Sequence, residues 1–235
     1  MGGFLCKIIT PEEMSISGKE NFMPTENSYK IRTKKKNLFL RVVKGHFATN
    51  HSHINYYIDV SIQKSRLSEA TALAQELVSY YNTTTVVDTI LCLDGTEVIG
   101  TCLANELTSA NFVNLNAHQT IYVVTPERTS GSQLIFRDSV APMIRGKNVL
   151  ILAASVSTGY TTKSAIEAIN YYGGMVAGVA AIFATADECM GFPVHSVFDP
   201  KDLDGYGSFP SHECPMCKAG QKIDALVNSF GYSKL

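Results

Sequence analysis

Hydroxyl-bearing residues gather around a single glycine in the stretch "SVSTGYTT", which runs from Ser155 to Thr162. An apolar run, "NVLILAA", precedes the stretch and predicts a strand, and "TTKSAIEAINYY" follows with the spacing of an amphipathic helix. The first turn of a helix presents unpaired backbone N–H groups and a partial positive charge, and Gly159 would let an anion approach them closely. This pattern is typical of a phosphate site, and the turn lacks the lysine of a P-loop, so a terminal monophosphate suits it better than a triphosphate. The alternative is an ordinary strand-to-helix turn with Thr161 as the N-cap.

A second candidate centre lies in "HECPMCKAG", where Cys214 and Cys217 have CxxC spacing and His212 is close. One CxxC supplies two metal ligands, whereas a closed structural zinc site needs four. Cys189 and His195 are distant residues that could complete such a set. We therefore treat His212, Cys214 and Cys217 as weak metal candidates, favour a packed loop with two thiols, and do not expect zinc.

The elements that would position these residues alternate between strands and helices from Thr85 onward. Continuously apolar runs, "VVDTILCL", "QTIYVV", "NVLILAA" and "MVAGVAAIFA", predict parallel strands, and "VIGTCLANEL" predicts a helix after the first. The fold class is therefore α/β, with a doubly wound, mainly parallel sheet. Ligand sites in such sheets lie beyond the carboxyl ends of the strands, where both "LDGTE" and "SVSTGYT" fall.

Composition narrows the classes of function. The chain has 235 residues, 45% of them hydrophobic, and a formal net charge of -1. This balance argues against a general nucleic-acid binder, and we expect no nucleic-acid partner. No stretch is long and apolar enough to span a bilayer, and the first residues do not look like a secretion signal, so we expect a cytoplasmic protein without a membrane partner. Lys34, Lys35 and Lys36 are expected to form a solvated face.

"VLILAASVSTGYT" resembles the signature of the type I phosphoribosyltransferases, in which an apolar strand, two acidic residues and a Ser/Thr-Gly turn hold phosphoribosyl pyrophosphate. "SHINYYIDVS" is similar to a strand near the start of the orotate phosphoribosyltransferases, and "ILCLDGTEVIGTCLANEL" looks like that family's pyrophosphate-loop strand, turn and helix. "CPMCKAG" resembles a C-terminal segment of some orotate-type members. These matches cover most of the chain from about Ser52 to Gly220, in the family's order.

The resemblance implies roles for particular residues. The connection from Thr125 to Arg145 would include the mobile loop that closes over the reaction centre, and Arg128 is its one obvious cation before Arg137, so Arg128 is the candidate catalytic residue. The pyrophosphate loop would be Asp94, Gly95 and Thr96, although Asp-Gly is also a common turn pair. The 5′-phosphate would be held by Ser157, Thr158, Gly159, Tyr160 and Thr161.

The chain departs from the family at the two acidic positions, which are Ala153 and Ala154. In the family these carboxylates accept hydrogen bonds from the ribose hydroxyls. Their loss removes about 1.5–3 kcal/mol for each charge-assisted hydrogen bond. Asp187 and Glu188, beyond the next strand, could approach the same crevice. The loop departs as well, since "TPERTSG" has no lysine.

Two functions stay open on these observations. In the first, the protein binds phosphoribosyl pyrophosphate or a nucleoside monophosphate and transfers phosphoribose to an orotate-like nucleobase, with Mg²⁺ held largely by the substrate's pyrophosphate. In the second, it binds the same ligands as a catalytically inactive sensor or partner subunit. The resemblance also implies a homodimer.

The predicted organisation has three parts. Residues 1–60 form an N-terminal hood or arm, 61–205 the α/β core, and 206–235 the CxxC segment closed by a short helix. The segments at both ends of the chain would together make a small hood over the core.

Overall fold

The structure is a computed structural model that describes residues 28–32, 38–109, 114–117, 119–131, 133–228 and 231–235. Lys34, Lys35 and Lys36, whose side chains we expect to be solvated, lie outside the described residues. Among the residues described, no helix is long and apolar enough to cross a membrane.

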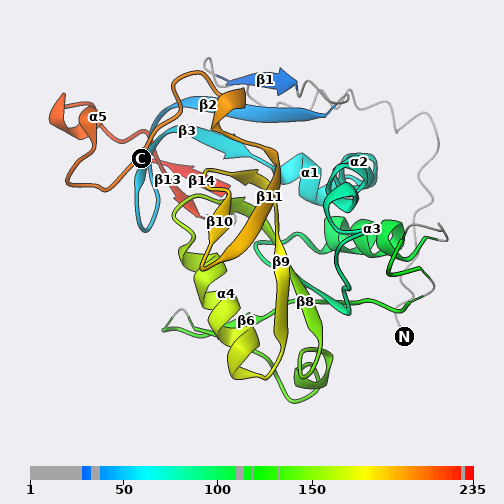
Figure 1. The fold of residues 1–235 in the computed structure, drawn as a ribbon. Helices are drawn as coiled ribbons and strands as arrows, with labels where there is room; N and C mark the ends of the chain where they lie inside the picture. The colour runs from blue at the N-terminus through cyan, green and yellow to red at the C-terminus, as the bar shows by residue number, and fades with distance from the viewer. Residues whose placement is uncertain (1–27, 33–37, 110–113, 118, 132, 229–230) are drawn as a thin grey trace, which may run out of the picture.

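A mainly parallel sheet forms the centre of the molecule (Figure 1). Its strand order is β10-β11-β9-β8-β4-β5, and every neighbouring pair is parallel except β10 with β11. The strands are β4 (Thr89–Cys92), β5 (Tyr122–Val124), β8 (Asn148–Val156), β9 (Met175–Ala184), β10 (Glu188–Cys189) and β11 (Phe192–Phe198). The predicted α/β fold class is therefore confirmed.

Helices cover both faces of this sheet because alternate residues of the buried strands point in opposite directions. Leu150 and Leu152 of β8 belong to the apolar cluster that includes α2 (Leu67–Leu77) and α3 (Glu97–Thr108). Val149 and Ile151 belong to the cluster on the other face, which includes α4 (Tyr160–Tyr171). Figure 1 shows α4 on one side of β9 and β8, with α2 and α3 on the other.

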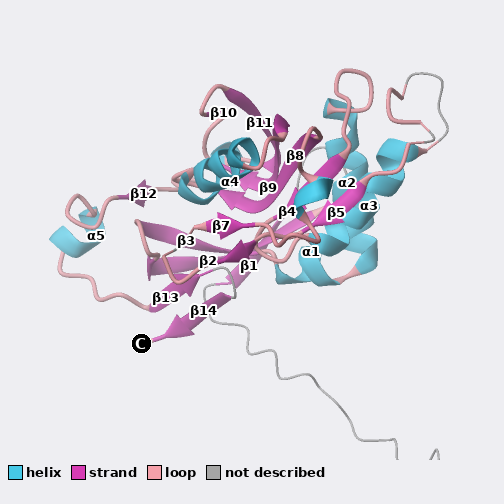
Figure 2. Ribbon diagram, turned by 90° about the horizontal axis from the view of Figure 1, so that it is seen from below, coloured by secondary structure: helices cyan, strands magenta, loops and turns pink. Residues whose placement is uncertain are grey.

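A second sheet forms the hood, in the order β12-β3-β2-β13-β14, with β1 also paired to β2 (Figure 2). β13 lies parallel to β2, with Ala225 opposite Phe47, so the hood joins segments from both halves of the chain as predicted. Its strands are β1 (Ser28–Arg32), β2 (Phe39–Ala48), β3 (His53–Asp59), β12 (Ser208–Phe209), β13 (Ala225–Asn228) and β14 (Gly231–Lys234).

The prediction that a short helix closes the C-terminal segment is wrong. Among the described residues of this segment, the helix is α5 (Pro215–Lys218), which ends before Gly220, whose φ of +73° does not continue a helix. The antiparallel pair β13–β14 follows, and β13 pairs with β2 and buries Ala225 in a small cluster with Phe47 and Tyr57.

Short elements lie between the main strands and helices. α1 (Ser61–Ser65) begins two residues after β3 ends, so the stretch "SHINYYIDVS", likened above to a strand, is a strand only as far as Asp59. β6 (Glu127–Arg128) and β7 (Leu134–Ile135) form an antiparallel pair in the long connection. Single 3₁₀ turns lie at η2 (Val78–Tyr80), η3 (Ala141–Met143) and η4 (Pro200–Asp202).

Candidate functional site

A cavity of about 440 Å³ lies where the hood meets the carboxyl ends of β4 and β8. The core contributes both predicted turns and Arg128, and the hood contributes the β2–β3 turn and β13 to β14. Core residues that line it include Asp94, Arg128, Ala154, Ser155, Ser157, Thr158, Tyr160 and Thr161. Hood residues that line it include Thr49, Asn50, His51, Tyr57, Val227, Asn228 and Gly231.

The hydroxyl-rich turn leads directly into α4. Gly159 is the N-cap with φ +71°, and no side chain caps the helix, so the alternative with Thr161 as the N-cap is wrong. The amides of the first turn therefore have no side-chain cap to compete with an anion. Thr185 supports the turn from β9 by donating its hydroxyl hydrogen bond to the Ser157 carbonyl at 2.8 Å. The turn thus presents both hydroxyls and helix N–H groups to the cavity.

The turn after β4 has two consecutive residues with left-handed backbone, Asp94 at φ +56° and Gly95 at φ +80°. Thr96 does not reach the cavity, because it is fully buried and its hydroxyl donates to the carbonyls of Leu93 and Leu152 at 2.9 and 3.0 Å. The predicted pyrophosphate loop therefore offers its first two residues to a ligand, while Thr96 ties the turn to β8.

Lys64 is a cation at this site that the sequence reasoning missed. Its Nζ donates to the Asp94 carbonyl at 2.8 Å, and it lines the cavity beside Arg128. Lys64 was missed because the residues after Asp59 look like the end of a strand in the sequence. In the structure they form α1, which directs Lys64 toward the core.

Among the described residues that line the first cavity, two cations, Lys64 and Arg128, accompany one carboxylate, Asp94. Burial raises the pKa of the Asp94 carboxyl above its ordinary value of 3.8, and Arg128 and Lys64 act in the opposite direction. Two cations thus flank one carboxylate, which leaves positive potential for an anionic ligand.

The long connection places Arg128 next to a second cavity of about 540 Å³, which shares Ser61, Lys64, Asp94 and Arg128 with the first. Glu127 does not face these cavities as a free acid, because it forms a two-point ion pair with Arg137, with both N–O distances at 2.6 Å. That pair lowers the pKa of Glu127 through its hydrogen bond to the guanidinium. It also ties β6 to the segment after β7.

The two alanines at the acidic positions have different surroundings. Ala154 lines the first cavity, whereas Ala153 is 1% exposed within the apolar cluster under α4. Ser155 also lines this cavity. Neither Asp187 nor Glu188 is among the described residues that line either cavity, so no acidic residue from beyond β9 replaces the missing pair there.

The cysteine segment forms a separate group away from this cavity. Cys214 and Cys217 lie next to His46 and His53, two residues that the sequence reasoning did not connect with them. His212 is outside this group and faces Glu213 at 3.3 Å. Cys189 instead lies beside Gly159, and His195 stacks on Tyr80.

No protein-family model matches the chain. Curated relatives do: orotate phosphoribosyltransferase of Chlorobium phaeobacteroides is 25% identical over 188 residues, which are 78% of this chain and 88% of that protein. Orotate phosphoribosyltransferase of Chlorobaculum parvum is 25% identical over 193 residues, with the same coverage of each chain. The predicted resemblance to the orotate type of phosphoribosyltransferase is therefore confirmed.

Solved structures are similar to this chain at lower identity. The structure of Leishmania donovani UMP synthase matches with a TM-score of 0.50 and 19% identity, over 69% of this chain and 34% of that one. Orotate phosphoribosyltransferase of Mycobacterium tuberculosis H37Rv, solved with Fe(III) dicitrate, matches with a TM-score of 0.49 and 19% identity, over 70% of this chain and 92% of that one. The chain thus spans about a third of the length of the UMP synthase chain, and its fold is that of the type I phosphoribosyltransferases.

Proposed function

We propose that this chain, which resembles orotate phosphoribosyltransferases and has the type I fold, binds phosphoribosyl pyrophosphate or a nucleoside monophosphate in the first cavity, between the hood and the strand ends. The observation that carries the proposal is the lining of that cavity, which joins an uncapped helix N-terminus to two cations. Each of these features favours an anion, and the cavity between them has room for a ribose.

In the proposed pose, the 5′-phosphate lies on the turn from Ser157 to Thr161. The pyrophosphate, where the ligand has one, lies toward Lys64, Arg128 and the backbone of Asp94 and Gly95. Arginine can hold two phosphate oxygens at once, whereas lysine acts as a point charge, so the two cations are not equivalent here. The ribose then passes Ala154, and the base faces the hood.

The same pose explains why we propose binding without ordinary transfer. At position 154 the ribose hydroxyls meet a methyl group, so the charge-assisted bonds, about 1.5–3 kcal/mol each, are missing. Positive charge that develops on the ribose during transfer would also lack a carboxylate nearby. The protein then acts as a sensor or as a partner subunit.

Phosphoribosyl transfer is the second candidate function, and Arg128 on the β6–β7 pair favours it. A hairpin over the pyrophosphate could exclude water from the reacting carbon. The residues present do not build a protein cage for magnesium, because Asp94 is the one carboxylate among the described residues lining the first cavity and two cations act on it. Mg²⁺ would therefore enter with a pyrophosphate-bearing ligand.

Calorimetry with phosphoribosyl pyrophosphate and with a nucleoside monophosphate, each at millimolar concentration, tests the binding proposal. We expect heat from at least one of them, and no heat from either would end it. A pyrophosphate-release assay across purine and pyrimidine bases then separates the two functions, since a sensor releases none. Sedimentation of the free protein tests the homodimer that the resemblance implies.

A further inference from the structure

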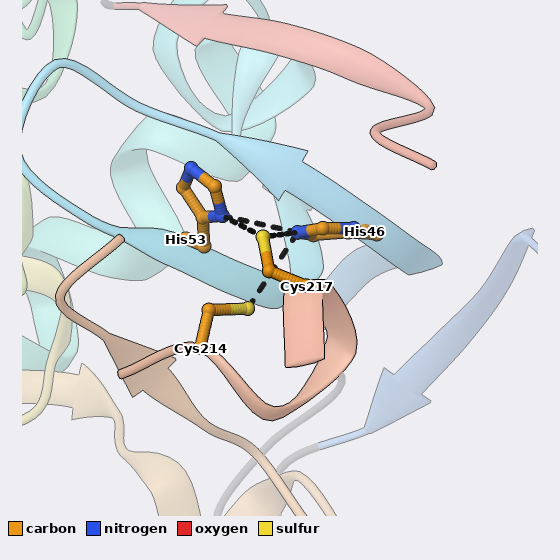
Figure 3. A group of neighbouring side chains, drawn as sticks. All are labelled: His46, His53, Cys214 and Cys217. Carbon is orange, nitrogen blue, oxygen red and sulfur yellow. Dashed lines mark hydrogen bonds between the residues drawn. The ribbon is translucent and has the colours of Figure 1, made fainter. Parts of the chain in front are cut away.

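Two histidines and two cysteines converge at the outer end of the hood (Figure 3). His46 comes from β2 and His53 from the start of β3, while Cys214 and Cys217 lie on either side of Pro215 and Met216 at α5. One potential ligand atom from each residue lies within 4.8 Å of the other three. None of these residues lines either of the cavities described above.

The separations of these atoms match a tetrahedral ion. With Zn–N bonds of about 2.0–2.1 Å and Zn–S bonds of about 2.3 Å, a regular tetrahedron puts two nitrogens about 3.3 Å apart and a nitrogen and a sulfur about 3.6 Å apart. Here His46 Nε2 lies 3.1 Å from His53 Nδ1 and 3.6 Å from each of the two sulfurs. Cys217 Sγ lies 3.2 Å from His53 Nδ1. Four of the six separations are thus close to those around a tetrahedral ion and the other two are within 4.8 Å, so one ion could contact all four atoms after side-chain shifts.

The far side of the His46 ring assigns its tautomer. His46 Nδ1 faces the carbonyl oxygens of Gln221 and Lys222 at 3.0 and 3.2 Å. Carbonyl oxygens only accept hydrogen bonds, so Nδ1 must carry the proton and Nε2 presents its lone pair to the group. A backbone carbonyl behind the second ring nitrogen is the usual support of a metal-binding histidine.

Hydrogen bonding alone leaves this group poorly satisfied. His46 and Cys214 are fully buried, and the single lone pair of His46 Nε2 is approached by a nitrogen and two sulfurs. One lone pair accepts one good hydrogen bond, whereas one cation can use the lone pairs of all four residues. Two thiolates with one divalent ion also leave no net charge to bury.

We propose that His46 Nε2, His53 Nδ1, Cys214 Sγ and Cys217 Sγ bind one structural zinc ion. Two thiolates and two imidazoles are ligands that suit zinc and not Mg²⁺ or Ca²⁺, which take oxygen. A set of four protein ligands leaves no open position, so the ion stabilises structure and does not activate water. On binding, each cysteine thiol loses its proton to solvent as its Zn–S bond forms.

The zinc ion would fasten the last strands to the β2–β3 hairpin. After α5, Asp224 accepts the His46 backbone N–H at 2.7 Å and donates its own N–H to the His46 carbonyl at 2.8 Å, and β13 then pairs with β2. The turn between the two histidines, Thr49 to His51, lines the first cavity, as does Asn228 of β13. The ion would therefore stabilise two walls of that cavity. The functional meaning of this consequence rests on the proposed function, whereas the zinc site itself does not rest on it.

Metal content of the untagged full-length protein tests the site. Mass spectrometry of the elements should give close to one zinc per chain. His53→Ala and Cys217→Ser should each lose most of that zinc, and His212→Ala is the matched control that should keep it, because His212 is next to the cysteines in sequence but outside the group. Zinc lost from His212→Ala and kept in His53→Ala would overturn this ligand set.

A second measurement does not depend on variants that fold. Cobalt exchanged into the wild-type protein should give the intense visible bands of tetrahedral Co²⁺ and a thiolate charge-transfer band. Octahedral bands only, no uptake of zinc or cobalt, or a Cys214–Cys217 disulfide in intact-mass analysis would each overturn the proposal. Because none of these readouts uses a phosphoribosyl ligand, they can fail or succeed independently of the calorimetry above.

Discussion

The turn at residues 157–161, where we propose that a phosphate binds, and the histidine–cysteine group are built in opposite ways. The turn places five consecutive residues, 157–161, around one helix N-terminus, whereas the group joins His46 to cysteines 168 and 171 residues away. The turn relies on backbone amides, which every residue supplies, and the group relies on four particular side chains. We therefore expect single substitutions to weaken the turn gradually, whereas the loss of any one ligand should empty the group.

The largest expected effect concerns the two adjacent alanines, which look equivalent in the sequence. Ala153→Asp should destabilise the protein by about 3–5 kcal/mol, because it puts an unpaired carboxylate in the apolar cluster under α4. Ala154→Asp should cost no more than about 1–2 kcal/mol, since position 154 borders the cavity. Urea unfolding of both variants measures the difference.

Calorimetry adds a second readout to the same pair. Ala154→Asp should also tighten the binding of phosphoribosyl pyrophosphate, because its carboxylate can accept hydrogen bonds from the ribose. Equal stability of the two variants, or no gain in affinity at position 154, would contradict our account of the missing acidic pair.

The next largest effect is expected at Arg128. Arg128→Ala should weaken phosphoribosyl pyrophosphate binding about ten- to a hundredfold, the equivalent of about 1.5–3 kcal/mol for a charge-assisted bond. A nucleoside monophosphate should lose less, because its one phosphate lies at the turn. Arg145→Ala is the matched control, since Arg145 is exposed and lines neither described cavity. An equal loss of affinity for both ligands would show that Arg128 does not act on the pyrophosphate in particular, contrary to the proposed pose.

Smaller effects are expected within the turn itself. Ser157→Ala and Thr161→Val should each weaken monophosphate binding by about 0.5–1.5 kcal/mol, because the amides of the turn remain. Ser164→Ala on the same helix, outside the cavity, should change nothing. If either turn variant abolished binding, the turn would be as interdependent as the histidine–cysteine group, and the contrast between them would fail.

The smallest effect is expected at Asp94 and depends on pH. The folded protein raises the pKa of this carboxyl, so the folded state binds its proton more tightly than the unfolded state does. The ionised carboxylate therefore lowers stability as the pH rises through its folded pKa, and Asp94→Asn should be slightly more stable than wild type at neutral pH. Thermal unfolding should show this gain disappear as the pH falls below the ordinary value of 3.8. A gain that grows toward acid would reverse the sign of our argument.

Much of the core could be predicted from the sequence because its signals are local. About ten residues of sequence are enough to recognise the apolar runs of β8 and β9 and the glycine that begins α4. The turn at Asp94 was found for the same reason, although the sequence could not show that the Thr96 hydroxyl is used inside the protein.

The rest depends on contacts between distant segments. Lys64 reaches Asp94 only because the chain turns into α1 after Asp59, and nothing near Lys64 in the sequence indicates that partner. Sequence proximity suggested His212 as the partner of the cysteines, whereas the imidazoles next to them in the structure belong to β2 and β3. The β13–β14 hairpin at the end of the chain was not predicted, because β13 forms a strand by pairing with β2, which is far away in the sequence.

The parallel pairing of β13 with β2 has a consequence for how the protein is made. His46 and Asp224 are 178 residues apart. At about 5–20 residues per second, a ribosome needs on the order of ten seconds or more to synthesise that interval. The α/β core can fold during this time, while the edge of β2 waits for its partner strand. The walls of the cavity therefore close last, and a chain interrupted before β13 would carry a folded core with an open site.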